Sequence, residues 1–316
     1  MIRCSKCKSN LLFKKTYSGK IFCTNPKCKF SRGGFFFFQK KPVLIPFGSK
    51  FCIFKNRKQL SLKASNKNRS NSRLNNLLVK FKDKLGGESK FTKSNYEFLS
   101  KFISQKTKVL FVGGGTKGSG SSYFYNSCNK YSASIEEIDI YNSSNVTAIA
   151  DAHYLPFEDE SFEIIVIQAV LEHVLNPERV VSEILRVLVN GGLVYAETPF
   201  MQTVHMGPND FLRYTHSGHR WLFREFKELN SGYTHGLFSS FKWIFAKALG
   251  SIFRNDMISK LIIRILSRPA YFLDSITPHR DNLDNACGLF FLGKKESKIN
   301  TLKKSSWIID YYFRNS

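Results

Sequence analysis

Short, unbroken apolar runs alternate with amphipathic segments through the middle of the chain. The runs are bounded by glycine or polar residues, as expected for strands buried in a parallel sheet. Residues 177–189 instead carry apolar side chains at helical spacing, with Pro177 in the first turn and glycines after the end. Strands that alternate with helices predict a doubly wound α/β fold with a mostly parallel sheet. We expect strands at residues 109–112, 133–141, 162–167, 193–199 and 287–295, the last closing the sheet.

Three consecutive glycines, Gly113, Gly114 and Gly115, follow the first of these strands. Glycine lets the backbone turn sharply there and approach a ligand that a Cβ would hold off. Asp139 comes 24 residues after Gly115, at the end of the second strand, where doubly wound folds place a carboxylate on a ribose. Gln168 leaves the end of the strand at 162–167, an edge where ligands bind. The glycine turn alone also suits dinucleotides, flavins and plain tight turns.

The ordered series KVLFVGGGTKGSG, DAHYLPFEDESFEIIVIQAVLEHV and NPERVVSEILRVLVNGGLVYAETPF resembles the class I S-adenosylmethionine-dependent methyltransferases, close to the family that includes the quinone-biosynthesis enzymes. The resemblance implies a seven-stranded Rossmann-like sheet that binds S-adenosylmethionine, with Asp139 at the ribose and Asp151 and Ala152 at the adenine. The implied cofactor-binding residues are Gly113, Gly114, Gly115, Asp139, Ile140, Asp151, Ala152 and Gln168.

Phe111 departs from the family pattern, because most members carry an acid two positions before the first glycine. In the family that acid helps to hold the amino group of the methionine. Its absence implies either that backbone carbonyls and Gln168 take over or that cofactor affinity is weaker. A copy of the fold that binds no cofactor is the alternative.

Four cysteines near the N-terminus predict a zinc site. Cys4 and Cys7 form one close pair, and Cys23 and Cys28 form a second pair after a hairpin-length insert. This is the pattern of a zinc ribbon, in which two knuckles supply four thiolates to a tetrahedral ion. Two disulfides are the alternative, although a cytoplasmic chain argues against them. Residues 33–54 resemble the end of the small, mostly structural zinc-ribbon modules that accompany many methyltransferases.

Positive charge is concentrated at the front of the chain. Residues 1–90 hold 23 Lys and Arg against 2 acidic residues, whereas the other 226 residues are close to neutral at a net +3. Such a segment attracts polyanions such as RNA, anionic membranes or acidic glycans. A lysine-rich composition with no partner is the alternative. The sequence shows neither a secretory signal nor an apolar run of the roughly 18 residues that a membrane span needs, which predicts a cytoplasmic protein.

Composition shifts along the chain predict its domain organisation. We expect a zinc-ribbon module at 1–56, a basic linker at 57–90, the methyltransferase domain at 91–296 and a C-terminal tail at 297–316. Within the domain, residues 237–272 place cations between apolar residues at helical spacing, such as Lys242 beside Trp243 and Arg264 between Ile263 and Ile265. This pattern fits helices lying on an anionic membrane, and it fits equally a lid over a hydrophobic substrate.

Polar residues after the strand at 193–199 are the candidate substrate contacts, because loops at this edge lie over the donor site. A neutral His205 is the candidate general base for a hydroxyl acceptor, with Asp210 orienting it. The alternative is catalysis by proximity alone, with His205 bonded to the backbone. We interpret His173 as a structural or cofactor-shell residue. The segment from Pro199 to Thr215 also resembles methyltransferases of bacterial surface polysaccharide and lipid-linked glycan synthesis.

Three functions follow from these patterns, and none of them fixes the oligomeric state. The first is methyl transfer, at oxygen, to a small-molecule acceptor or to a glycan acceptor, including a lipid-linked glycan. The second is RNA methylation through the basic front end. Residues 168–171 read Gln-Ala-Val-Leu rather than an Asn-Pro-Pro-Tyr-like tetrad, which argues against exocyclic base amines as acceptors. The third is a scaffold that binds cofactor or partner without turnover.

Overall fold

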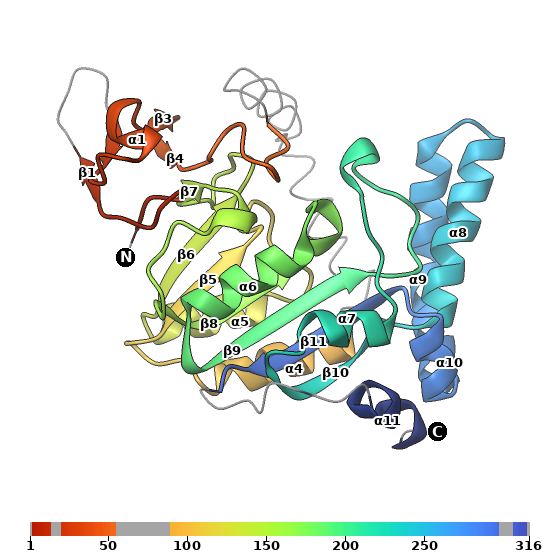
Figure 1. Cartoon of the computed structure of the whole chain (residues 1–316). Helices are drawn as coiled ribbons and strands as arrows, with labels where there is room; N and C mark the ends of the chain where they lie inside the picture. The colour runs from red at the N-terminus through yellow and green to blue at the C-terminus, as the bar shows by residue number, and fades with distance from the viewer. Residues whose placement is uncertain (1, 14–19, 55–88, 297–305, 315–316) are drawn as a thin grey trace.

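One large sheet organises the molecule. The computed structural model describes residues 2–13, 20–54, 89–296 and 306–314 of the chain. Its nine-stranded sheet has the order β10-β11-β9-β8-β5-β6-β7-β4-β3 (Figure 1). The first seven of these form the predicted methyltransferase sheet, and the fold class is confirmed. Their bounds are β5 Lys108–Val112, β6 Ser134–Asp139, β7 Ala148–Ile149, β8 Phe162–Gln168, β9 Leu188–Pro199, β10 Lys227–His235 and β11 Gly288–Lys294.

Parallel pairing runs from β7 through β6, β5 and β8 to β9, and β11 pairs antiparallel to both β9 and β10. The chain builds outward from β5 in one direction to β6 and β7, then returns to β8 on the other side of β5. The gap between the ends of β5 and β8 is therefore a topological switch point, where ligands bind in open α/β sheets.

Both faces of the sheet are covered by helices. Leu110 and Val112 of β5 join one core cluster with residues of α6 and α7, whereas Val109 and Phe111 join a second cluster with residues of α4 and α5. This alternation follows from the two-residue period of a strand that is buried on both sides. The helices are α4 Lys90–Ser100, α5 Ser122–Lys130, α6 Pro177–Val187 and α7 His216–Leu222.

The edge of the sheet differs from the sequence prediction. The strand expected to close the sheet, β11, lies inside it, and β10 takes the edge instead. The prediction missed β10 because KELNSGYTH is mostly polar and exposed at its start, as an edge strand can be. Helix α6 also ends earlier than expected, at Val187, and passes directly into β9. Gly191 and Gly192 therefore lie within a strand rather than in a helix stop.

The N-terminal module extends the same sheet. It contains β1 Leu11–Phe13, β2 Ile21–Cys23, α1 Lys29–Arg32, β3 Phe36–Phe38 and β4 Lys41–Val43. β4 pairs parallel to β7 through Val43 and Ile149, and the Leu44 N–H donates to the Ile149 carbonyl at 2.8 Å. The module is thus continuous with the methyltransferase sheet. Most of the predicted linker at 57–90 lies outside the described residues, and Ser89 caps α4 by accepting from the Thr92 N–H.

A buried ion cluster locks the module against α6. Lys8 Nζ lies 2.7 Å from Glu183 Oε2 and donates to the Leu155 carbonyl at 2.9 Å. Glu183 is only 3% exposed and also accepts from Arg186 Nε at 2.9 Å. These charge-assisted bonds hold the Glu183 pKa below its ordinary value, although burial alone would raise it.

Helices α8 Leu237–Ile252 and α9 Asp256–Ile276 follow β10 and stand as a hairpin at the end of the sheet away from the N-terminal module (Figure 1). A short helix, α10 His279–Asp284, leads back to β11. Part of the predicted tail forms α11 Ser306–Arg314, where Trp307 and Tyr311 pack on the Arg220 guanidinium. Among the described residues, no helix has both the length and the apolar character to cross a bilayer.

We predict that Glu183→Ala lowers the free energy of unfolding by about 3 kcal/mol, because it leaves a largely buried lysine without its carboxylate. Glu158→Ala is the matched control, since its ion pair with Arg3 lies at the surface and is expected to contribute less than about 1 kcal/mol. Urea unfolding at neutral pH measures both values. Equal losses in the two variants would contradict the locking role of the buried cluster.

Candidate functional site

A pocket of about 450 Å³ opens at the carboxyl ends of β5, β6, β8 and β9. Its lining includes seven of the residues singled out in the sequence: Gly113, Asp139, Ile140, Asp151, Ala152, Gln168 and His205. Gly114, Gly115 and Asp210 are not among the lining residues, although Gly115 contacts Asp139 and Asp210 contacts His205. The pocket also takes in residues that sequence reasoning missed, namely Phe51, Ile53, Thr116, Glu172 and Glu197. The structure thus brings the predicted site residues to one place.

The glycine turn packs too closely against its neighbours to carry side chains at Gly113 and Gly115. Gly113 has a φ of +82°, and a Cβ there would collide with Val170. A Cβ on Gly115 would collide with the Asp139 carboxylate, which instead accepts the Gly115 N–H at 3.0 Å. The second Asp139 oxygen accepts the Tyr141 N–H at 2.8 Å. Asp139 is therefore held in one orientation at the pocket wall.

Asp151 presents one carboxylate oxygen to the far end of the pocket. Its Oδ1 accepts from the His153 N–H at 3.0 Å and lies 2.6 Å from His153 Nδ1. The Asn176 N–H donates to His153 Nε2 at 3.2 Å, so Nδ1 carries the proton and donates to Asp151. Oδ2 is buried and accepts no hydrogen bond from any described residue. An amino group of a ligand would satisfy this oxygen.

Phe51 comes from the N-terminal module and closes this end of the pocket by stacking on His153, with ring centroids 5.3 Å apart. The sequence carries no local signal for this contact, because the parallel pairing of β4 with β7 is what brings residues 51–53 to the pocket.

Glu197 supplies a second buried carboxylate to the lining of the pocket. It accepts from Thr92 Oγ1 at 2.6 Å, from Gln168 Nε2 at 2.8 Å and from the Tyr195 hydroxyl. Burial raises the pKa of Glu197 above its ordinary value, despite these hydrogen bonds. Both ends of the Gln168 amide are engaged in this network, because Nε2 donates to Glu197 and Oε1 accepts from the Tyr96 hydroxyl. No cation of the described residues forms an ion pair with Glu197.

His205 and Asp210 lie together on the loop after β9, as the sequence suggested. Asp210 Oδ2 accepts the His205 N–H at 2.8 Å and lies 3.5 Å from His205 Nδ1. A hydrogen-bonded pair with Arg213 holds the pKa of Asp210 at about 2. The Glu172 carboxylate, 3.6 Å from His205 Nε2, raises the pKa of His205. The role of His205 as general base, with Asp210 orienting it, stays a prediction.

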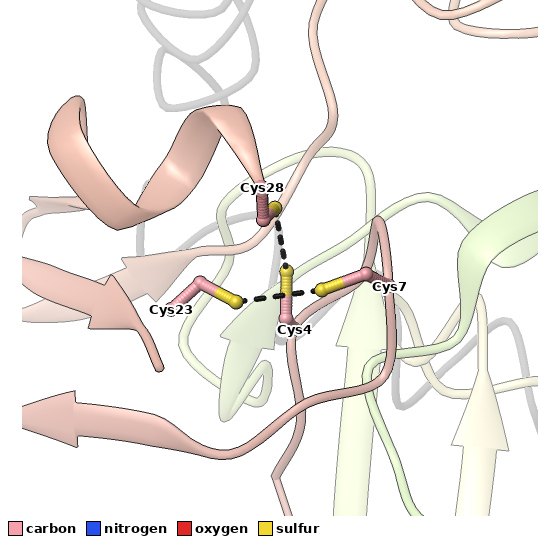
Figure 2. A group of neighbouring side chains, drawn as sticks. All are labelled: Cys4, Cys7, Cys23 and Cys28. Atoms are coloured by element: carbon pink, nitrogen blue, oxygen red, sulfur yellow. Dashed lines mark hydrogen bonds between the residues drawn. The ribbon is translucent and has the colours of Figure 1, made fainter. Parts of the chain in front are cut away.

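The four predicted metal-binding cysteines converge in the N-terminal module (Figure 2). All are free thiols, and their sulfur atoms lie within 4.8 Å of one another. Cys7 and Cys23 are 3.4 Å apart and Cys4 and Cys28 are 3.8 Å apart. Sulfurs bound to one tetrahedral zinc at about 2.3 Å lie about 3.8 Å apart, so the cluster fits a zinc ion. Zinc itself stays a prediction.

Comparison with known families gives one match on the central part of the sheet. Residues 115–196 match a family model described as a methyltransferase domain. The chain contains a methyltransferase domain. The matched residues of this methyltransferase domain run from the glycine turn through Asp139, Asp151 and Gln168 to β9. No curated protein matches the chain.

Several solved structures resemble the methyltransferase domain at low identity. Phosphoethanolamine N-methyltransferase 2 of Haemonchus contortus, in complex with S-adenosyl-L-methionine, is 16% identical with a TM-score of 0.42, over 65% of this chain and 52% of that one. The YcgJ protein of Bacillus subtilis is 18% identical with a TM-score of 0.41, over 65% and 99%. The [4+2]-cyclase SpnF is 16% identical with a TM-score of 0.43, over 65% and 81%.

We predict that replacing Cys4 and Cys7 by serine removes about one equivalent of zinc per chain relative to the wild type, because two of four thiolates are lost. Cys128→Ser is the control, since Cys128 lies buried in α5, away from the cluster. Metal analysis after dialysis measures the difference. Equal zinc contents in the double variant and the wild type would show that the cysteine cluster does not hold the metal.

Proposed function

We propose that this chain transfers a methyl group from S-adenosylmethionine to a hydroxyl oxygen of a small-molecule or glycan acceptor. The observation that carries the proposal is the pocket, which combines a glycine turn, the oriented Asp139 and the buried Asp151 oxygen without a partner. Bound S-adenosylmethionine would supply an electrophilic methyl group on a sulfonium. The methyltransferase domain match on residues 115–196 supports methyl transfer in general.

The pocket residues divide the cofactor between them in this proposal. Asp151 Oδ2 accepts from the exocyclic amine of the adenine, and Phe51 packs beside the ring. Asp139 accepts from the ribose hydroxyls. Glu197 faces the α-ammonium group of the methionine. Most family members hold this amino group with an acid at the position that Phe111 occupies on β5. In this chain Glu197 on β9, rather than Gln168, would take that role. A buried carboxylate with no protein cation is matched by a cationic ligand group.

The α8–α9 hairpin supports an acceptor that is bound to lipid. Ten of its large apolar side chains are at least 39% exposed: Phe241, Ile244, Phe245, Ile252, Phe253, Met257, Leu261, Ile265, Phe272 and Ile276. The lid alternative would have buried them. Arg264 is exposed beside them as the pattern suggested, but Lys242 is 3% exposed, with its Nζ 4.6 Å above the Tyr271 ring. Lys242 therefore cannot face a membrane, and that part of the expectation was wrong.

RNA methylation stays the second candidate. It rests on the basic charge of residues 1–90, of which residues 55–88 lie outside the described part of the chain. Cytoplasmic localisation likewise stays an expectation.

We predict that the chain binds S-adenosylmethionine at micromolar level, about 8 kcal/mol, in calorimetry. Asp139→Ala should weaken binding at least tenfold, because the ribose contact is lost, whereas the surface variant Asp159→Ala should not. Binding should also weaken as pH falls through the raised pKa of Glu197, because a protonated carboxyl no longer attracts the ammonium group.

Methylthioadenosine separates the two ends of the cofactor, since it carries the adenine and ribose but no amino acid. Glu197→Gln should weaken S-adenosylmethionine binding and leave methylthioadenosine binding unchanged. Asp139→Ala should weaken both. If Asp139→Ala binds both ligands as the wild type does, the cofactor assignment is wrong.

We predict that the chain pellets with anionic liposomes at low salt and is released at high salt, because each exposed cation near the surface adds about 1 kcal/mol. Replacing Phe241, Ile265 and Phe272 by serine should abolish pelleting, whereas serine at the exposed Phe102, outside the hairpin, should not. An unbound wild type at low salt would remove the support for a lipid-linked acceptor.

A further inference from the structure

Three potential metal ligands meet on the loop side of the pocket. Glu172 and His173 lie in the short 3₁₀ helix Leu171–His173 that follows β8, and His205 lies on the loop after β9. His173 Nε2 and His205 Nε2 are each 3.6 Å from Glu172 Oε1. The three ligand atoms all lie within 4.8 Å of one another, and all three residues line the pocket. Ligands that share one ion at about 2.0–2.2 Å lie about 3.0–3.5 Å apart, so small side-chain shifts would close the site.

The buried carboxylate of Glu172 lacks the hydrogen bonds that would normally compensate for its burial. Its side chain is 1% exposed, and neither carboxylate oxygen has a hydrogen-bond partner among the described residues. Burying a carboxylate costs several kcal/mol unless it is fully paired, and the two histidines approach only Oε1, at 3.6 Å, without forming a hydrogen bond. The two histidine nitrogens face the same oxygen from just beyond hydrogen-bond distance. A cation placed between them would satisfy the carboxylate and both rings.

The outer atoms of the two histidines are arranged as they are in metal sites. His173 Nδ1 lies 2.7 Å from the Asn209 carbonyl, which can only accept, so Nδ1 carries the proton and Nε2 presents a lone pair. His205 Nδ1 lies 3.5 Å from Asp210 Oδ2, and Arg213 fixes that carboxylate. Metal-binding histidines commonly donate their second N–H to a carbonyl or carboxylate in this way.

We propose that Glu172, His173 and His205 bind one divalent first-row transition ion at the acceptor end of the pocket. Two imidazoles and one carboxylate suit such ions and leave positions open toward the pocket. This site is separate from the cysteine cluster, which holds only thiolates. In this arrangement Asp210 is a positioning residue that acts through His205, and His205 is a ligand rather than a free base.

The ion gives the proposed methyl transfer a way to ionise its acceptor, and this part rests on the proposed function. A hydroxyl that coordinates the ion loses its proton to solvent more readily, because the metal lowers its pKa. The oxygen then forms a bond to the methyl carbon as the carbon–sulfur bond breaks. The electron pair of that bond goes to sulfur, and the products are a methyl ether, S-adenosylhomocysteine and one proton. The acceptor class is therefore an alcohol or phenol that can reach a pocket-bound metal.

The test is a titration of the full-length, tag-free protein with Mn²⁺, followed by the loss of the free Mn²⁺ signal in electron paramagnetic resonance. Mn²⁺ is chosen because oxygen and nitrogen donors bind it in preference to thiolates. We expect one Mn²⁺ per chain, displaced by Zn²⁺. Glu172→Gln and His205→Ala should each weaken binding at least tenfold. His279→Ala is the matched control, since His279 lies in α10 and does not line the pocket.

Three results would overturn the site. The first is a wild type that binds no Mn²⁺ at millimolar concentration, and the second is a Glu172→Gln variant that binds as tightly as the wild type. Loss of the bound Mn²⁺ in the Cys4→Ser, Cys7→Ser double variant alone would place the ion at the cysteines and also reject the proposal. Calorimetry with S-adenosylmethionine on the same variants separates this failure from that of the proposed function. Retained cofactor binding also shows that a variant is folded.

Discussion

The glycine turn after β5 is the constraint on which the pocket depends. Any side chain at Gly113 or Gly115 would collide with Val170 or with the Asp139 carboxylate. Val112 of β5 pairs with Ile138 of β6 and with Ile167 of β8, so the three strands end together, and Asp139, Gln168 and Val170 all line the pocket. The chain order places this turn at the switch point of the sheet, where the loops after β5 and β8 diverge.

The pocket is built by parts of the chain that are distant in sequence. The N-terminal module adds two strands to the sheet edge and brings Phe51 to the Asp151 end. The loop after β9 brings His205 to Glu172, and the Phe211 N–H donates to the Glu172 carbonyl at 2.8 Å, which holds that loop in place. The Lys8–Glu183 cluster holds the module in place. Zinc at the cysteine cluster would thus stabilise the module that carries Phe51, without contacting the bound S-adenosylmethionine.

Much of the site can be predicted from local sequence, because its residues lie at the ends of strands that are recognisable as short apolar runs. The apolar runs and the glycine turn predict that Asp139 and Gln168 lie at the pocket, and the cysteine spacing alone predicts the cluster of four thiols. Glu197, Phe51 and β10 were missed because their roles come from pairing between distant strands. His173 was interpreted only as a structural or cofactor-shell residue, because the position of His205 relative to Glu172 depends on a loop path that no periodicity encodes. Lys242 was wrongly predicted to face a membrane for a related reason. Helical spacing does not show which face of α8 packs against Tyr271 of α9.

The central claim is that one pocket holds the methyl donor with its adenine at Asp151 and its methyl group toward a metal at Glu172, His173 and His205. Paramagnetic broadening tests it most directly, because bound Mn²⁺ relaxes nearby protons far more strongly than distant ones. Proton NMR of S-adenosylmethionine in exchange with the Mn²⁺-loaded protein should show the S-methyl signal broadened more than the adenine signals, and Glu172→Gln should remove the difference. Adenine signals that broaden as strongly as the methyl signal, or no broadening of either, would contradict the account.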